Sequence, residues 1–213
     1  MIESAAGLVL RTRPLTESSI IVHWLTADLG RLATVAKGAH RPKSPFRGKL
    51  DLFYEADFTF ARSRRSELHT LREMSLRDTH TALREDLVYL RQASYAAALL
   101  EQTTETETPL PGMLQLMKGF LSALPERPPE PQMLFAFELK LARELGLEPD
   151  LEQVRLTPGA REILKAFLAG DWARCSLIRL SNPQKEELRQ FLHGFLIYHL
   201  GKLPPNRTRA LLT

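Results

Sequence analysis

The amino-acid sequence predicts an α+β protein, with an N-terminal five-stranded OB-type β-barrel followed by an all-α helical domain. The first part of the chain alternates apolar and polar residues with the period of two that is typical of strands, most clearly over residues 52–60. After about residue 80 the spacing becomes helical, and Leu83, Leu87 and Leu90 share one helical face. The 213 residues are enough for two small domains, which we place at residues 1–79 and 80–213.

Five segments of the first domain have strand character, and they are residues 7–13, 19–25, 31–37, 52–60 and 66–76. Asp28, Leu29 and Gly30 form a tight turn signal between two of them. Leu68 and Leu71 break the alternation of the last segment, which indicates either a β-bulge or a wrong assignment. Five short strands favour a barrel, because closure removes exposed edges. An SH3-like barrel fits the same pattern.

Proline, glycine and capping residues divide the second domain into five predicted helices. We expect them at residues 83–100, at 111–124, from the Pro131 region to Leu145, from Thr157-Pro158 to Gly170, and from Asn182-Pro183 to Gly201. The segment of residues 103–109 is predicted as a solvated loop.

The composition excludes several classes of protein. The single cysteine, Cys175, forms no internal disulfide and builds no zinc site alone, so we expect an intracellular, cytoplasmic protein. No 18-residue apolar run and no signal-peptide pattern is present. No phosphate-binding glycine loop, nucleophile elbow or histidine pair with metal spacing occurs. The sequence therefore predicts no catalytic residues, no bound metal and no cofactor, and a possible enzyme would need a site assembled from distant residues.

Excess positive charge is confined to the first part of the chain. Residues 1–80 contain 13 lysines and arginines and 9 acidic residues, whereas residues 81–213 contain 16 of each. No acidic residue occurs between Asp28 and Asp51. Glycines and prolines make residues 38–48 a loop, so several cations should lie on one face of the barrel. Such a surface neutralises consecutive phosphates and releases counterions.

The predicted nucleic-acid-binding residues comprise the cations of this region and the rings among them: Arg31, Lys37, His40, Arg41, Lys43, Phe46, Arg47 and Lys49. Depending on strand order, Arg11, Arg13, Arg62, Arg64 and Arg65 extend the surface. Phe46 and Phe53 are the candidate platforms on which bases stack, whereas Trp24 and Tyr54 are assigned to the core. The competing interpretation is a solvated loop without a partner.

Several short motifs are spread along nearly the whole chain: Gly7–Leu10, Thr26 and Gly30, Val35–Ala39, Arg41–Ser44, Leu68–Glu73, Arg84–Tyr95, Phe137–Gly146 and Tyr198–Pro204. In their order and spacing they resemble the RecO recombination-mediator family. The resemblance implies an OB barrel, binding of single- and double-stranded DNA, and annealing of complementary strands. It also implies that the protein works with RecR to load RecA onto strands covered by single-stranded-DNA-binding protein (SSB), and that Lys37, Arg41 and Lys43 contact DNA.

Two departures from the family pattern affect the expectations. Many members carry a four-cysteine zinc module after the segment that resembles 146–149, but the stretch 150–157 is short and has no cysteine, so the zinc module is absent. The acidic tail of SSB docks on the helical domain in this family, yet no basic residue directly precedes Phe137. We assign its contact to other cations of the helical domain, namely Lys140, Arg143, Lys202, Arg207 and Arg209.

The sequence therefore predicts a non-enzymatic protein of the nucleoid that binds and pairs DNA strands for repair and recombination. Two other functions remain open at this point: an RNA-binding OB protein, and an adaptor that binds only proteins. The sequence indicates neither the oligomeric state nor the strand preference.

Overall fold

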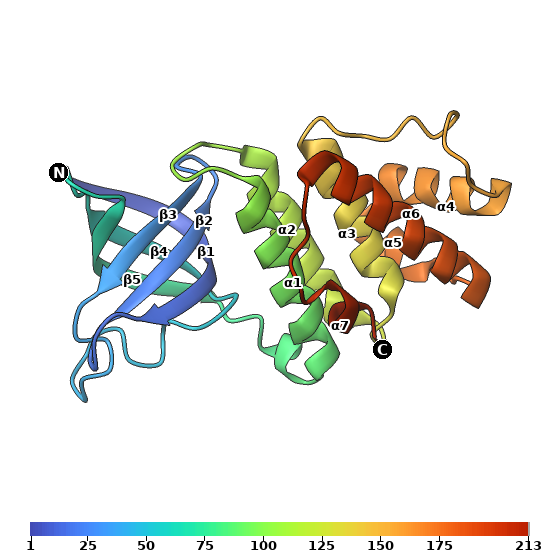
Figure 1. Cartoon of the computed structure of the whole chain (residues 1–213). Coiled ribbons are helices and arrows are strands. Elements are labelled where there is room, and N and C mark those ends of the chain that lie inside the picture. The colour runs from blue at the N-terminus through green and yellow to red at the C-terminus, as the bar shows by residue number, and fades with distance from the viewer. Residues whose placement is uncertain (213) are drawn as a thin grey trace. The chain divides into compact units, whose positions relative to one another are not determined.

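The computed structural model describes residues 1–212, and the chain folds into two compact units (Figure 1). One unit contains residues 1–81 together with 104–115. The other contains residues 82–103 and the chain from Leu116 onward. The helix Pro111–Ala123 therefore begins in the first unit and ends in the second.

The first unit is a closed five-stranded barrel, in agreement with the prediction. Its strands are β1 Ile2–Pro14, β2 Ile20–Thr26, β3 Arg31–Ala36, β4 Glu55–Ala61 and β5 Leu68–Asp78. They are hydrogen-bonded in the order β1-β2-β3-β5-β4, and β4 pairs back to β1. All neighbours are antiparallel except β3 and β5, which run parallel through three residue pairs. The α+β class and the five-stranded OB-type barrel are thus confirmed.

The strand β4 begins later than its hydrophobic pattern predicts, at Glu55 instead of Leu52. Phe53 has a φ of 65°, which takes it out of the strand alternation. Its ring is fully buried, so the prediction that Phe53 lies on the wetter face is wrong. Within the strand, the predicted inward positions of Phe58 and Phe60 are confirmed. The register of β4 and β5 shifts between Thr59 and Phe60, which leaves Arg72 of β5 as the extra residue. Residues 68–71 themselves pair in regular register, so the parity break between Leu68 and Leu71 is not a bulge, and Leu68 lies on the outer face.

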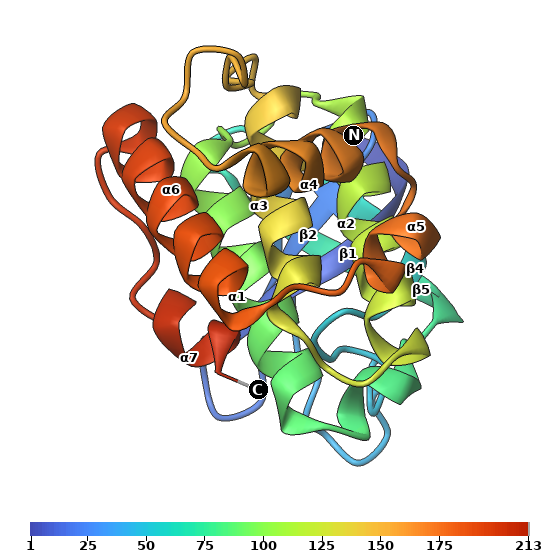
Figure 2. The same ribbon diagram turned by 90° about the vertical axis from the view of Figure 1, so that its right-hand side faces the viewer.

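The second unit is built around one buried helix, in the middle of Figure 2. The helices within residues 1–212 are α1 Leu87–Thr103, α2 Pro111–Ala123, α3 Pro131–Glu144, α4 Pro158–Ala169, α5 Trp172–Leu177, α6 Asn182–Leu200 and α7 Arg207–Leu211, with short 3₁₀ turns at Thr81–Arg84 and Leu124–Glu126. The helix α3 packs against α1, α4, α5, α6 and α7, and every residue from Pro131 to Ala142 is buried. Its apolar sequence therefore forms the centre of the helical core.

Capping residues set the helix boundaries as predicted. The hydroxyl of Thr157 accepts a hydrogen bond from the backbone N–H of Ala160 at the start of α4. Ser181 caps α6 together with Gln184 in a capping box, one residue before the predicted Asn182. The helices α5 and α7 were not predicted, because six and five residues are too few for a periodic pattern.

A buried ionic cluster connects the C-terminal helix α7 to the core helix α3. Arg207 donates to both oxygens of Glu138, at 2.6 and 2.8 Å. The hydroxyl of Tyr95 donates to the same carboxylate at 2.6 Å. Burial acts to lower the pKa of Arg207, but the hydrogen bonds and charge of Glu138 outweigh it and raise that pKa. The cluster therefore stays ionised and joins α1, α3 and α7.

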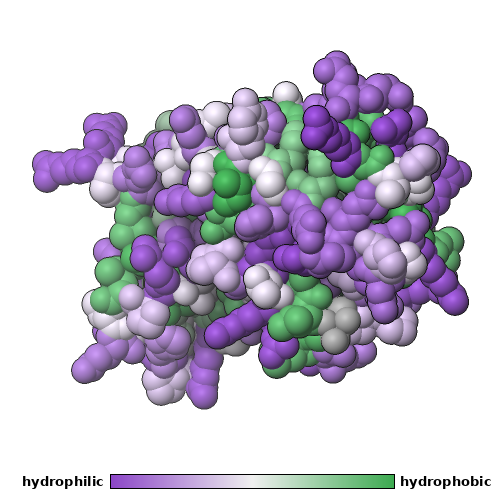
Figure 3. Space-filling view, turned by 45° about the vertical axis from the view of Figure 1, so that its right-hand side comes forward, coloured by the Kyte–Doolittle hydropathy of each residue, from purple (hydrophilic) through white to green (hydrophobic). Residues whose placement is uncertain are grey.

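The surface is largely polar. In the space-filling view of Figure 3, hydrophilic side chains cover most of the visible face, and apolar side chains gather there only in small groups. Within residues 1–212, no helix has the length and apolarity needed to cross a membrane.

Candidate nucleic-acid interface

Residues 37–54 form a long connection from β3 to β4, at one end of the barrel (Figure 1). We call this segment the basic loop. Its backbone folds into successive turns, in which Arg41, Ser44, Arg47 and Lys49 donate N–H groups to the carbonyl oxygens three residues before them. Gly38 opens the loop with a φ of 65°, a conformation that favours glycine. The loop is therefore an ordered structure, and its cations project from a defined backbone.

The basic loop is attached to the barrel by apolar anchors and by hydrogen bonds. Ala39 and Phe46 are buried in the barrel core at 4% and 6% exposure. The N–H of His40 donates to the carbonyl oxygen of Ser18, and the N–H of Gly38 donates to the hydroxyl of Ser19. These contacts hold the loop against the turn between β1 and β2.

A groove of about 680 Å³ lies between the basic loop and that turn. Lys37, Arg41 and Lys43 line one side of it, so the structure brings together the three cations that the family resemblance singled out. The hydroxyl-bearing residues Thr16, Ser18 and Ser19 line the other side, with Ser44 nearby. None of the lining residues is acidic. The groove thus offers ammonium, guanidinium and hydroxyl donors together, which are the groups that contact phosphate oxygens.

The cations of the basic loop are not neutralised by carboxylates. Lys37, Arg41, Lys43 and Arg47 are exposed, and none of them forms an ion pair within the described part of the chain. Arg47 makes one long hydrogen bond to the carbonyl oxygen of Pro42. His40 is exposed and Lys49 is half-buried on the same loop. This surface is therefore available to a polyanion.

The hydroxyl side of the groove was missed by the sequence reasoning. Thr16, Ser18 and Ser19 belong to the turn between β1 and β2, which also contains Glu17, and nothing in the sequence of this turn indicates a binding site. The available signal was the run of four hydroxyl and carboxylate residues before β2. Such a run indicates a turn, but its place beside the basic loop depends on the pairing of β1 with β2.

Arg31 does not belong to this surface, and its assignment as a nucleic-acid contact is corrected. It is the first residue of β3, whereas Lys37 follows the last one, so the length of the strand separates them. The guanidinium donates to the hydroxyl of Thr104 at 2.7 Å and also to the carbonyl oxygen of Thr104. Arg31 therefore holds the 104–108 segment against the barrel.

Strand order also determines where Arg62, Arg64 and Arg65 lie relative to the basic loop. The parallel pairing of β3 with β5 places the connection of residues 62–67 at the Arg31 end, because Ala33 pairs with Leu68. Arg62 there forms a bidentate ion pair with Glu3. Arg64 and Arg65 thus lie away from the basic loop.

The outer face of β1 and β2 does carry positive charge. Arg11 pairs across the strands with His23, and Arg13 pairs with Ile21. Burial first, and then the charges of Arg11, Arg13 and Arg31, lower the pKa of His23 to about 4. His23 is therefore neutral near pH 7, and the positive potential on this face comes from arginines.

Phe46 is not an exposed stacking platform. Its ring is only 6% exposed and packs with the barrel core, because it is the apolar anchor that a long polar loop needs. Phe53 is likewise fully buried. The core position of Trp24 is confirmed, and its indole N–H donates to the hydroxyl of Thr34 at 2.8 Å. Tyr54 packs against the same core but remains partly exposed.

A substitution separates the anchoring role of Phe46 from a stacking role. Phe46→Leu keeps an apolar group in the core and removes the aromatic face, so we expect DNA affinity to change less than about twofold. Phe46→Ala leaves a cavity that costs about 3–5 kcal/mol of unfolding free energy and should release the loop. Fluorescence anisotropy with a labelled single strand measures both variants. A loss of tenfold or more in Phe46→Leu would restore the stacking interpretation.

Two of the cations assigned to partner binding are structural. Lys140 is buried and donates to the carbonyl oxygen of Gly170 at 2.6 Å, and burial lowers its pKa. Arg207 is 5% exposed and bound to Glu138. Neither side chain can reach a protein partner, so both assignments are corrected. Arg143, Lys202 and Arg209 are exposed, and Arg143 also donates to the carbonyl oxygen of Leu168.

Comparisons with known proteins agree with this architecture. The family model described as Recombination protein O N terminal matches residues 1–80. The model described as Recombination protein O C terminal matches residues 84–155 and 152–209. The two matches therefore cover most of both units of the chain.

Curated relatives are similar along nearly their full lengths. The DNA repair protein RecO of Symbiobacterium thermophilum is 30% identical over 90% of this chain and 89% of its own length. That of Exiguobacterium sibiricum is 27% identical over 94% and 93%. That of Anaeromyxobacter sp. strain K is 30% identical over 92% and 91%. The chain belongs to the RecO family of non-enzymatic DNA repair and recombination proteins.

Proposed function

We propose that this protein binds single- and double-stranded DNA through the basic loop and pairs complementary strands. The observation that carries the proposal is the groove in which Lys37, Arg41 and Lys43 lie together without an acidic residue. Family membership supports an interaction with DNA. The groove contains donors for phosphate oxygens and no exposed aromatic platform, so binding should depend little on sequence.

Annealing needs only that two backbones share one positive surface. Phosphate repulsion slows the meeting of complementary strands, and neutralisation by lysine and arginine lowers it. The bases stay free to sample complements, because Phe46 and Phe53, the two candidate stacking rings of the loop, are buried. No bond is made or broken, so neither nucleotide nor metal is required for this activity.

The finer part of the proposal concerns protein partners. We propose that the protein acts with RecR to load RecA onto strands covered by SSB, as the family resemblance implies. For the acidic tail of SSB, the exposed cations Arg143, Lys202 and Arg209 remain the proposed contacts. Their charge is accessible, unlike that of Lys140 and Arg207.

A fluorescence annealing assay tests the function. Two complementary oligonucleotides, one labelled with a donor and one with an acceptor, are mixed without nucleotide or metal, and we expect the protein to accelerate pairing at least tenfold. Pre-coating both strands with SSB should preserve the acceleration, and excess of a peptide with the SSB tail sequence should reduce it. Equal-length RNA serves as competitor. No acceleration on bare DNA at low salt would refute the proposal and favour a protein adaptor, and preferential inhibition by RNA would favour an RNA-binding protein.

A further inference from the structure

The basic loop returns to the barrel through a short segment just before β4. Phe53, its next-to-last residue, is fully buried, and its N–H donates to the carbonyl oxygen of Val9 on β1 at 2.8 Å. The N–H of Val9 donates in turn to the carbonyl oxygen of Tyr54 at 2.9 Å. The half of the loop that carries Arg47 and Lys49 is therefore attached to β1 at this point.

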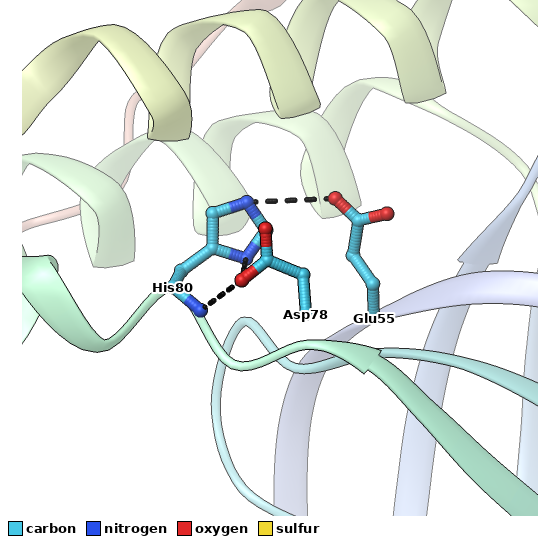
Figure 4. Close-up of side chains that lie close together, drawn as sticks. All are labelled: Glu55, Asp78 and His80. Carbon is cyan, nitrogen blue, oxygen red and sulfur yellow. Dashed lines mark hydrogen bonds and ion pairs between the residues drawn. The ribbon is translucent and has the colours of Figure 1, made fainter.

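The side chain of His80 joins the same segment to the end of β5. Its Nδ1 lies 2.8 Å from the carbonyl oxygen of Phe53, and because a carbonyl oxygen only accepts, Nδ1 carries a proton and donates it. The side chain is 4% exposed, and its other ring nitrogen faces Oε1 of Glu55 at 3.4 Å (Figure 4). The backbone N–H of His80 donates to the carboxylate of Asp78 at 2.8 Å. The ring is thus a buried link between the basic loop and the residues that follow β5.

Both residues joined by the Nδ1 hydrogen bond have an unusual backbone conformation. Phe53 has a φ of 65° and His80 a φ of 44°, in the left-handed region that bulky side chains rarely adopt. Such strain persists only where the surrounding structure requires it, and it gathers at functional sites. The arrangement places the ring of Phe53 in the core and its carbonyl oxygen at the imidazole of His80.

A second buried histidine of the barrel has a different role. Nε2 of His69 lies 2.6 Å from Oε1 of Glu107, and its Nδ1 accepts the N–H of Ser63. Ser63 belongs to the connection at the Arg31 end of the barrel, away from the basic loop. Of the two histidines, only His80 contacts the loop within the described residues.

We infer that His80 is a positioning residue for DNA binding, which holds one half of the basic loop against the barrel; this role rests on the proposed function of the loop. Arg47 and Lys49 lie between two buried anchors. These anchors are Phe46 and Phe53, so the cations keep their places only while both stay in the core. Without the Nδ1 donor, the carbonyl oxygen of Phe53 loses its partner, which favours release of this segment into water. A loop that is ordered before DNA arrives binds at a lower entropic cost.

Two substitutions separate the hydrogen bond from the ring. His80→Gly adopts a φ of 44° without strain but lacks the donor. His80→Asn tolerates the left-handed region and carries an amide donor at the δ position, as Nδ1 does. In anisotropy titrations, His80→Gly should bind single strands about tenfold more weakly, and its slope of log affinity against log salt should change from about −4 to about −3. His80→Asn should stay within about twofold of the wild type.

His69→Asn is the matched control, because it removes a buried histidine from the same barrel. It should lower the Tm and leave the salt slope of DNA binding unchanged. Amide hydrogen exchange of the DNA-free protein gives a second readout. Residues 47–54 should exchange faster in His80→Gly than in the wild type, whereas the amides between β1 and β2 should exchange at the same rate in both.

The exchange measurement separates failure of this role from failure of the proposed function. Unchanged exchange of residues 47–54 in His80→Gly would overturn the role of His80, whether or not the protein binds DNA. Absence of DNA binding by the wild type would instead refute the proposed function itself. An equal loss of affinity in His80→Asn and His80→Gly would also overturn the role, because the Nδ1 donor would then not be what holds the loop. An equal loss in His69→Asn would do the same, since general destabilisation would then explain the effect.

Discussion

Replacing Lys37, Arg41 and Lys43 together by alanine is expected to weaken DNA binding by roughly 100-fold at low salt, from about 1 kcal/mol for each lost charge-assisted contact. All three line the groove beside the basic loop and lack ion pairs. If about six phosphates are neutralised, the slope of log affinity against log salt for single strands is about −4, and the triple variant should show about −2. Anisotropy titrations from 50 to about 300 mM salt measure both. The loss should be uniform across oligonucleotide sequences.

A control triple variant removes the same charge from other places. Arg64 and Arg65 lie at the Arg31 end of the barrel, and Arg155 lies in the helical unit. Alanine at these three positions should change affinity at pH 7 by less than about threefold, because distant exposed charges are screened within about 10 Å. Equal losses in both triple variants would show that net charge, not the groove, sets the affinity. An unchanged salt slope in the groove variant would reject the site.

Glu138→Ala is expected to lower the unfolding free energy of the helical unit by about 3–5 kcal/mol, because it leaves a buried guanidinium without its counterion. Arg207 is 5% exposed and bonded to both carboxylate oxygens, and the hydroxyl of Tyr95 loses its acceptor at the same time. The helix α7 should then detach first. Urea unfolding followed by far-UV circular dichroism reports on these helices.

The double variant Glu138→Leu, Arg207→Met is the control for this effect. Apolar residues of similar volume remove both charges at once, so the double variant should be at least 2 kcal/mol more stable than Glu138→Ala. A loss below about 1 kcal/mol in Glu138→Ala would mean that water replaces the carboxylate and that the cluster is not a structural connection.

The fold was largely predictable, because its elements leave local signals. Strand alternation placed Phe58 and Phe60 in the barrel core, and Thr157 capped a helix as expected. The parity break between Leu68 and Leu71 did not mark a bulge, because these residues pair regularly and the register shifts one residue later, at Arg72. Errors arose where tertiary structure overrides a local pattern. Phe53 continues the strand alternation in sequence, yet its left-handed backbone turns it into the core.

The candidate site was predictable in part, because charge is visible in sequence and position is not. The region free of carboxylates marked the basic loop, and three of its cations share the groove. Arg31 looked like part of the same run, although the length of β3 separates it from the loop. The hydroxyl side of the groove comes from a separate segment, the turn between β1 and β2. Only strand pairing brings such residues together.

The seam between β3 and β5 has a kinetic consequence. It consists of three residue pairs, and the whole of the basic loop and β4 lies between its two sides in sequence. Three residue pairs give little hydrogen-bonding gain to set against the entropic cost of closing this loop, whereas β1 and β4 pair through seven. The remaining strands can assemble as an open curved sheet first, and the seam should close last. Amide protons between β3 and β5 should exchange with solvent hydrogen sooner than those between β1 and β2. The seam is then the place where the barrel opens locally.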